Sequence, residues 1–90
     1  MRIMKPLTLQ TPAQLASHLR SFRKARGLTQ AALAQLAGLD QTRIAKIERD
    51  PRRVSVGQLL QLLAVLQVRV LFEPVSEKPQ KPIRADRTEW

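Results

Sequence analysis

The chain of 90 residues contains no cysteine, one histidine and few aromatic residues, and these shortages exclude several kinds of site. Without cysteine there are no disulfides and no thiolate metal ligands, which fits a reducing cytoplasm. The single histidine, His18, cannot build a His cluster or a two-histidine zinc motif. We therefore expect neither a metal nor a cofactor.

Long apolar runs are also missing. No stretch approaches the roughly 20 apolar residues that a membrane-spanning helix needs, and residues 1–9 lack the apolar run of a secretory signal. The serines have only His18 as a possible base, and no acidic pair has catalytic spacing. The sequence predicts a cytoplasmic protein that is no enzyme and has neither a membrane partner nor a small-molecule substrate.

Acidic residues are scarce as well, since 7 Asp and Glu stand against 16 Lys and Arg for a formal net charge of +9. Residues 1–74 hold twelve of the basic side chains and four of the acidic ones. Such a basic segment attracts polyanions, because Lys and Arg release counterions when they meet phosphates. Charge alone leaves nucleic acids, membrane surfaces and ribosomes open as partners.

Capping residues and apolar spacing predict one all-α domain of four to five helices. We expect an extended arm over residues 1–10, the folded domain over residues 11–74 and a disordered tail over residues 75–90. Gly27 and Gly38 end the first two helices. Helices are predicted to begin at four capping residues, of which the first and last also have a capping-box glutamine: Thr11, Thr29, Asp40 and Ser55.

Helical periodicity then assigns an inner and an outer face to each helix. In the first helix, the basic side chains Arg20, Arg23, Lys24 and Arg26 are expected outside the apolar stripe. The predicted inward positions are Leu15, Leu19 and Phe22 in the first helix, Leu33, Leu36 and Ala37 in the second, and Ile44 and Ile47 in the third.

The short third helix carries an unusual outer face. Opposite its two isoleucines lie Thr42, Ala45, Lys46 and Arg49, flanked by Gln41 and Arg43. Amide, hydroxyl and cationic side chains are those that read base edges and hold phosphates. The small residues Ala34 and Gly38 precede it at the spacing of a helix-turn-helix, in which the second helix enters the major groove of DNA.

The segment RKARGLTQAALAQLAGLDQTRIAKIERD resembles the helix-turn-helix of the phage-repressor (Cro/C1, XRE) family in its LTQ opening, A-x-x-x-G turn and I-x-x-I-E close. The likeness covers roughly residues 12–66. It implies a structural role for Glu48, which pairs locally with a basic side chain. It also implies that Gln30 contacts the DNA backbone and that four side chains face the groove. These four are Gln41, Thr42, Arg43 and Lys46. With Arg49 on the same outer face, the predicted DNA-binding residues are Gln30, Gln41, Thr42, Arg43, Lys46 and Arg49.

After Leu66 the pattern changes from helix to strand. Residues 68–73 are β-branched and roughly alternating, and Pro74 ends them. A single strand cannot satisfy its own backbone groups, so either the N-terminal arm or a second copy of the chain must pair with it. Pro6 interrupts the arm, which favours a homodimer paired through Val68, Val70 and Phe72. A two-fold dimer predicts an inverted-repeat DNA operator.

Typical phage repressors commonly have a fifth helix at this point. The predicted strand departs from them and resembles HipB-type antitoxins, small dimeric repressors that neutralise a HipA-type serine/threonine kinase toxin. Their EW-like tails are similar to Glu89-Trp90 here. The resemblance implies a bacterial protein, associated with the nucleoid when bound to DNA, that autoregulates its operon and binds the kinase through Trp90. The alternative is a stand-alone XRE-type transcriptional regulator or restriction-control protein without a toxin partner.

Overall fold

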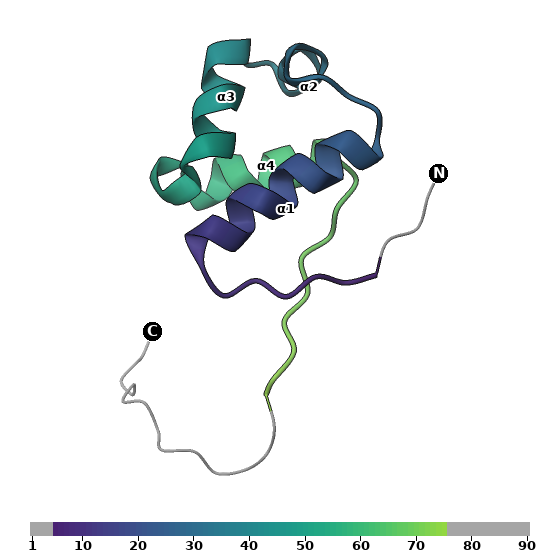
Figure 1. Ribbon diagram of the computed structural model, residues 1–90, viewed down its shortest axis with the longest axis vertical. Coiled ribbons are helices and arrows are strands. Elements are labelled where there is room, and N and C mark those ends of the chain that lie inside the picture. The colour runs from purple at the N-terminus through teal and green to yellow at the C-terminus, as the bar shows by residue number, and fades with distance from the viewer. Residues whose placement is uncertain (1–4, 76–90) are drawn as a thin grey trace.

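The computed structural model describes residues 5–75, and within them the chain forms four α-helices, one short 3₁₀ helix and no β-strand. The all-α class is therefore confirmed, with the lower of the two expected helix numbers. In Figure 1, α2 and α3 form the upper part of the body and α1 crosses in front of α4 below them. The elements are α1 (Pro12–Ala25), α2 (Gln30–Ala37), α3 (Gln41–Arg49), η1 (Pro51–Arg53) and α4 (Val56–Val65).

Each α-helix begins at the predicted capping residue. Thr11 accepts a hydrogen bond from the backbone N–H of Gln14 at 3.1 Å, and the Gln14 side chain accepts from the Thr11 N–H at 3.2 Å. Thr29, Asp40 and Ser55 accept from the third residue after them at 3.0, 2.8 and 3.0 Å. These bonds satisfy donors that have no partner inside a helix, and they fix where each helix starts.

The turn between α2 and α3 depends on Gly38. Its φ of +73° lies in the left-handed region, where a side chain is strained. The next N–H, that of Leu39, donates to the carbonyl of Ala34 at 2.9 Å and closes the end of α2. The predicted break is thus confirmed, and it lets α3 leave α2 within three residues.

The core lies where the four helices meet. Leu19, Leu33, Ile44 and Leu66 are its fully buried large side chains, and Ile47 is buried beside them. The inward assignment of the two isoleucines of α3 is confirmed. This packing fixes the rotation of α3 about its axis, so the opposite face must point outward.

One predicted core residue of α2 is wrong. Leu36 is 57% exposed, whereas Ala34 is buried at 3%. On a helix wheel Leu33, Ala34 and Ala37 share one arc, and Leu36 lies more than a quarter turn from its centre. A helix of eight residues buries a single stripe, and Ala34 lies on this stripe in the same core cluster as Ile44 and Ile47.

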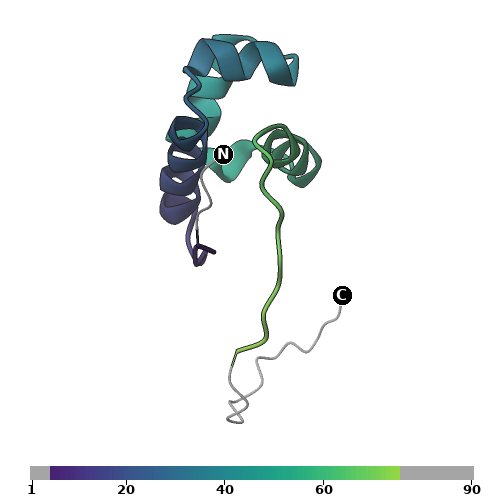
Figure 2. The same ribbon diagram turned by 90° about the vertical axis from the view of Figure 1, so that its right-hand side faces the viewer.

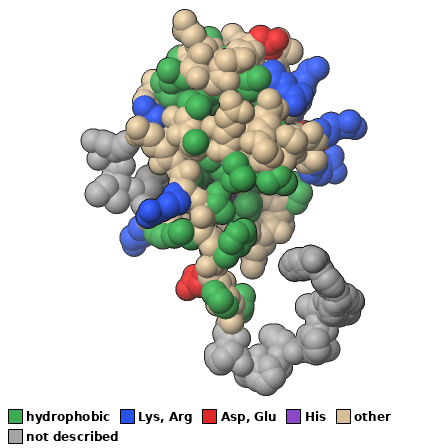
Figure 3. Space-filling view, turned by 180° about the vertical axis from the view of Figure 1, so that it is seen from behind, with side chains coloured by type: hydrophobic (Ala, Val, Ile, Leu, Met, Phe, Trp, Pro, Cys, Tyr) green, Lys and Arg blue, Asp and Glu red, His purple; other side chains and the backbone are tan. Residues whose placement is uncertain are grey.

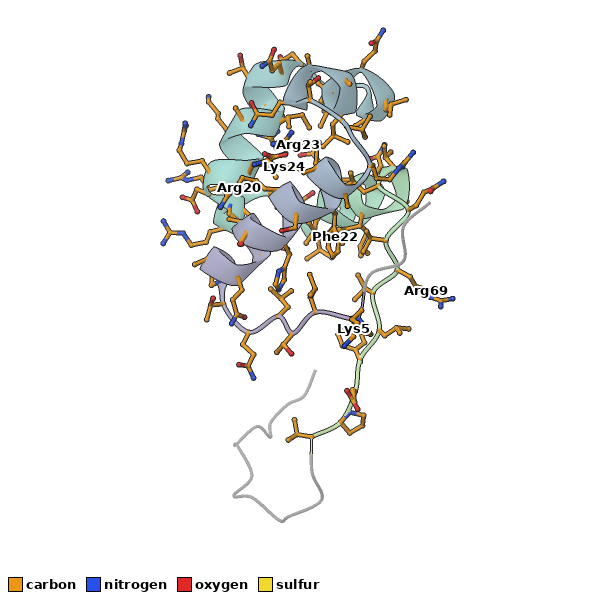
Figure 4. All side chains as sticks on the ribbon, turned by 45° about the vertical axis from the view of Figure 1, so that its right-hand side comes forward. Lys5, Arg20, Phe22, Arg23, Lys24 and Arg69 are labelled. Atoms are coloured by element: carbon orange, nitrogen blue, oxygen red, sulfur yellow. The ribbon has the colours of Figure 1, made fainter. Side chains whose placement is uncertain are left out.

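Arg23 also differs from its expected place, because it is buried at 8% exposure and not on the outer face of α1. Its Nε donates to Glu48 Oε2 at 2.7 Å and its NH2 to Glu48 Oε1 at 3.1 Å. The third nitrogen, NH1, donates to the carbonyl of Leu28 at 2.9 Å. The structural role implied for Glu48 is confirmed, but its basic partner is not local, because Arg23 lies 25 residues earlier, in α1 (Figure 4).

The chain leaves α4 through a strained residue, Gln67, whose φ is +63°. The following N–H, that of Val68, donates back to the carbonyl of Leu63 at 2.8 Å. Arg26, the C-cap of α1, reinforces this end, since its NH1 donates to the carbonyl of Val65 at 2.9 Å. A left-handed non-glycine residue costs on the order of 1 kcal/mol, which the bonds around it offset.

Residues 68–75 then run as an extended segment away from the helices, as Figures 1 and 2 both show. Within residues 5–75 they pair with no other strand, so the predicted strand and its dimer pairing stay predictions. At the other end, residues 5–10 are also extended, and the carbonyl of Thr8 lies 2.6 Å from His18 Nε2. Across the described residues, no helix has the length and apolar character needed to span a membrane.

Candidate nucleic-acid interface

The outward face of α3 consists of polar side chains held by a buried inner face. Ile44, Ile47 and Glu48 are buried, and Ala45 is half-buried. The exposed side chains are Gln41, Thr42, Arg43, Lys46 and Arg49. The structure therefore brings five of the six predicted DNA-binding residues together on one face. Figure 3 shows one group of Lys and Arg side chains at the right-hand edge of the helical body and others at the opposite edge.

Gln30, the sixth predicted residue, is the first residue of α2 and is half-buried. Its Nε2 donates to Glu48 Oε1 at 3.2 Å. An amide nitrogen carries two hydrogens, so this bond orients the group and leaves a second hydrogen for another acceptor. Gln30 thus belongs to the same network as the buried Arg23–Glu48 pair, which ties the start of α2 to α3.

The N-terminal turn of α3 carries no acidic residue, and Arg43 lies there. A cation at this end opposes the helix dipole by some tenths of a kcal/mol. In the structure the NH2 of Arg43 donates to Gln58 Oε1 at 2.7 Å. The guanidinium is therefore directed toward the first turn of α4.

This contact corrects the predicted capping box of α4. Ser55 accepts from the Gln58 N–H as expected, but the Gln58 side chain bonds to Arg43 and does not return to the N-cap backbone. Gln58 therefore contacts a predicted DNA-binding residue, which the sequence did not indicate. The capping-box spacing was present in the sequence, but nothing in it brings Gln58 to a residue fifteen positions earlier.

Further arginines border the face, and the sequence did not single them out. Arg20 of α1 donates from NH1 to the carbonyl of Glu48 at 3.0 Å, at the end of α3 (Figure 4). Arg53 is exposed in η1, the 3₁₀ turn that follows α3. These residues extend the positive surface beyond α3.

Arg52 of η1 is the exception among these cations, because an acidic side chain holds it. Its Nε and NH2 donate to the two carboxylate oxygens of Asp50 at 2.8 and 3.0 Å. The hydrogen bond from Arg52 lowers the pKa of Asp50 to about 2. Asp50 therefore stays ionised at neutral pH and locally offsets the charge of Arg52.

The model of the helix-turn-helix family matches residues 19–72, which contain α2, α3 and α4 and most of α1. The chain belongs to this Cro/C1-type (XRE) helix-turn-helix family. As a helix-turn-helix protein it is a DNA-binding transcriptional regulator. The second helix of the motif is α3, the helix whose outer face is polar and basic.

Three relatives of this helix-turn-helix protein span most of its folded part. Control protein C.SmaI of Serratia marcescens is 38% identical over 56 residues, which are 62% of this chain and 67% of that protein. A HipB-O1-O2 complex is 25% identical with a TM-score of 0.69, covering 76% of this chain and 99% of that one. The restriction-modification controller protein C.Esp1396I is 29% identical with a TM-score of 0.61, covering 64% and 75% of the two chains.

The residues predicted for assembly lie apart from the α3 face of the helix-turn-helix protein. Val68 is half-buried against the core, whereas Val70 and Phe72 are 46% and 94% exposed. Trp90, predicted to bind a partner, lies outside the described residues. Among residues 5–75 there is no group of three or more His, Asp or Glu side chains that could hold a metal ion.

Proposed function

We propose that the protein is a dimeric repressor that inserts α3 into the major groove at each half of an inverted-repeat operator. The observation that carries this proposal is the division of α3 into two faces. Ile44 and Ile47 are 1% and 3% exposed, while the side chains opposite them are polar and exposed. A helix anchored in this way presents a fixed set of donors and acceptors to DNA.

The side chains of this face divide by chemistry into two groups. Gln41, Thr42 and Arg43 lie in the first turn of α3, and their side chains suit adenine, thymine and guanine edges. Lys46 and Arg49 lie in the last turn, where cations also favour the helix dipole. Lys46 faces the groove with a charge that attracts any sequence. Gln30 and Arg49 hold phosphates on either side, which fixes the register of the helix.

Replacing Gln41 or Arg43 by alanine is expected to cost about 1–3 kcal/mol of operator binding and to relax specificity at one position of each half-site. Lys46→Ala is the matched comparison, because it should weaken binding to all sequences alike. Titrations against the operator and scrambled DNA measure both effects. Unchanged affinity and specificity in the Gln41 and Arg43 variants would contradict the groove assignment.

We further propose that the protein is the antitoxin of a kinase-toxin module and represses its own operon. The HipB complex supports this reading, since the likeness covers 99% of that chain and extends beyond the helix-turn-helix. The relatives C.SmaI and C.Esp1396I, named as a control protein and a controller protein, favour the second candidate, a restriction-control regulator. Both candidates use the same DNA-binding face.

A pull-down from the native host separates the two candidates. If the protein is an antitoxin, the full-length bait is expected to recover a HipA-type serine/threonine kinase. Deleting Trp90 should reduce that recovery, because it should weaken the binding free energy for the kinase by up to a few kcal/mol, the scale on which aromatic anchors contribute. It should leave operator affinity unchanged. Recovery of no kinase would favour the restriction-control reading. Equal recovery by both baits would retain the antitoxin and exclude the tryptophan as its anchor.

A further inference from the structure

The hydrogen bond between Arg43 and Gln58 connects the outer face of α3 to the first turn of α4. The two atoms, Arg43 NH2 and Gln58 Oε1, are 2.7 Å apart. Gln58 is half-buried, and its own N–H is held by the Ser55 hydroxyl at 3.0 Å. The acceptor therefore lies on an anchored turn, and Arg43 reaches it from the exposed face of α3.

The bond leaves the guanidinium able to read a base. An arginine has five N–H donors, and Gln58 occupies one of them, on NH2. A guanine edge accepts two hydrogen bonds, at O6 and N7. The second NH2 hydrogen, both NH1 hydrogens and the Nε hydrogen remain as donors, and a guanine edge needs two of them. Gln58 and a guanine can therefore bind Arg43 at the same time.

Holding the side chain in this way reduces the conformational entropy that Arg43 loses when it binds DNA. A free arginine loses much rotamer entropy when it docks, whereas a side chain already held in one orientation loses less. The plane of the guanidinium also decides which base edges meet its hydrogen-bond donors. The bond from Gln58 orients this plane and occupies one of the five N–H donors.

On the basis of the proposed contact between Arg43 and DNA, we infer that Gln58 is a positioning residue that sets the base preference of Arg43. It acts through the guanidinium of Arg43 and reads no base of its own. The regulator's specificity thus depends on a residue of α4, outside the helix-turn-helix pair.

The test is a double-mutant cycle on Arg43 and Gln58. The wild-type protein first selects an operator from random double-stranded DNA. Wild type, Gln58→Ala, Arg43→Ala and the double variant are then titrated against this operator, its single base-pair variants and scrambled DNA. Gln58→Ala is expected to lower the preference for the operator over its variants by about 3- to 10-fold, which corresponds to the loss of one hydrogen bond. This loss should occur at the base pair that Arg43→Ala also affects. Gln58→Ala should have no further effect in the Arg43→Ala background.

Two further variants exclude a general effect on folding or charge. Gln58→Glu keeps an acceptor for Arg43, so base preference should be retained while affinity for all DNA falls through repulsion from phosphates. Gln61→Ala alters an exposed glutamine of the same helix and should leave base preference unchanged. Thermal unfolding of each variant shows whether the fold is intact.

Additive effects of the Arg43 and Gln58 substitutions would overturn the inference, because Gln58 would then act independently of Arg43. Loss of base preference in Arg43→Ala but not in Gln58→Ala would overturn the inference alone and keep the proposed DNA contacts. No loss in Arg43→Ala itself would overturn both the positioning role and the groove contact of Arg43.

Discussion

Replacing Glu48 by alanine is expected to lower the free energy of unfolding by about 3–5 kcal/mol, because it leaves the Arg23 guanidinium buried without its carboxylate. The two side chains are only 10% and 4% exposed and meet at 2.7 Å. Glu48 also accepts from Gln30, so the substitution loosens the start of α2 as well. Urea unfolding followed by circular dichroism measures the loss.

The chain offers a matched control in the exposed pair between Asp50 and Arg52. Asp50→Ala also removes a carboxylate from an arginine, but Arg52 keeps its contact with water and 69% of its side-chain surface is exposed. We expect a much smaller change in stability there, since exposed ion pairs contribute little. The double variant Arg23→Met, Glu48→Met should lose less than Glu48→Ala, because no uncompensated charge stays buried. A loss below about 1 kcal/mol in Glu48→Ala would mean that the site is hydrated.

Local signals in the sequence predicted much of the fold. The N-caps at Thr11, Thr29 and Asp40 depend on residues within three positions of the cap, and all of them formed as expected. The turn at Gly38 and the inward rotation of Ile44 are equally local, since they follow from one residue's φ and from a period of 3.6. These features were enough to place the polar face of α3.

The features that the sequence did not predict depend on which helix packs against which. Arg23 is buried because Glu48, twenty-five residues later, lies opposite it. Leu36 is exposed because the buried stripe of α2 runs through Leu33 and Ala34. The Gln58 side chain does not form the predicted capping box because α4 begins within hydrogen-bonding reach of Arg43. Periodicity assigns a face to each helix, but it contains no information on these pairings between distant segments.

The exposed segment after α4 provides the second large expected effect, on assembly. Val70, Leu71 and Phe72 are 46%, 71% and 94% exposed in a single chain. Their backbone groups have no strand partner within residues 5–75. Apolar side chains with unpaired backbone are the features through which an edge strand joins another chain. The segment also starts from an anchored point, because the bonds of Val68 and Arg26 hold the end of α4.

Val70→Asp is therefore expected to weaken dimerisation by roughly 100-fold or more, about 3 kcal/mol, since each protomer would bring a carboxylate into the shared strand pair. Operator binding should fall with it, because half-sites roughly 34 Å apart, or a multiple of that, need two linked copies of α3.

Leu71→Asp is the matched control. It makes the same change one residue later, on the opposite face of an extended chain, and should affect dimerisation less. Light scattering and operator titration measure the two effects. A wild-type monomer at micromolar concentration would refute the pairing, and equal losses in both variants would refute the assignment of its buried face to Val68, Val70 and Phe72.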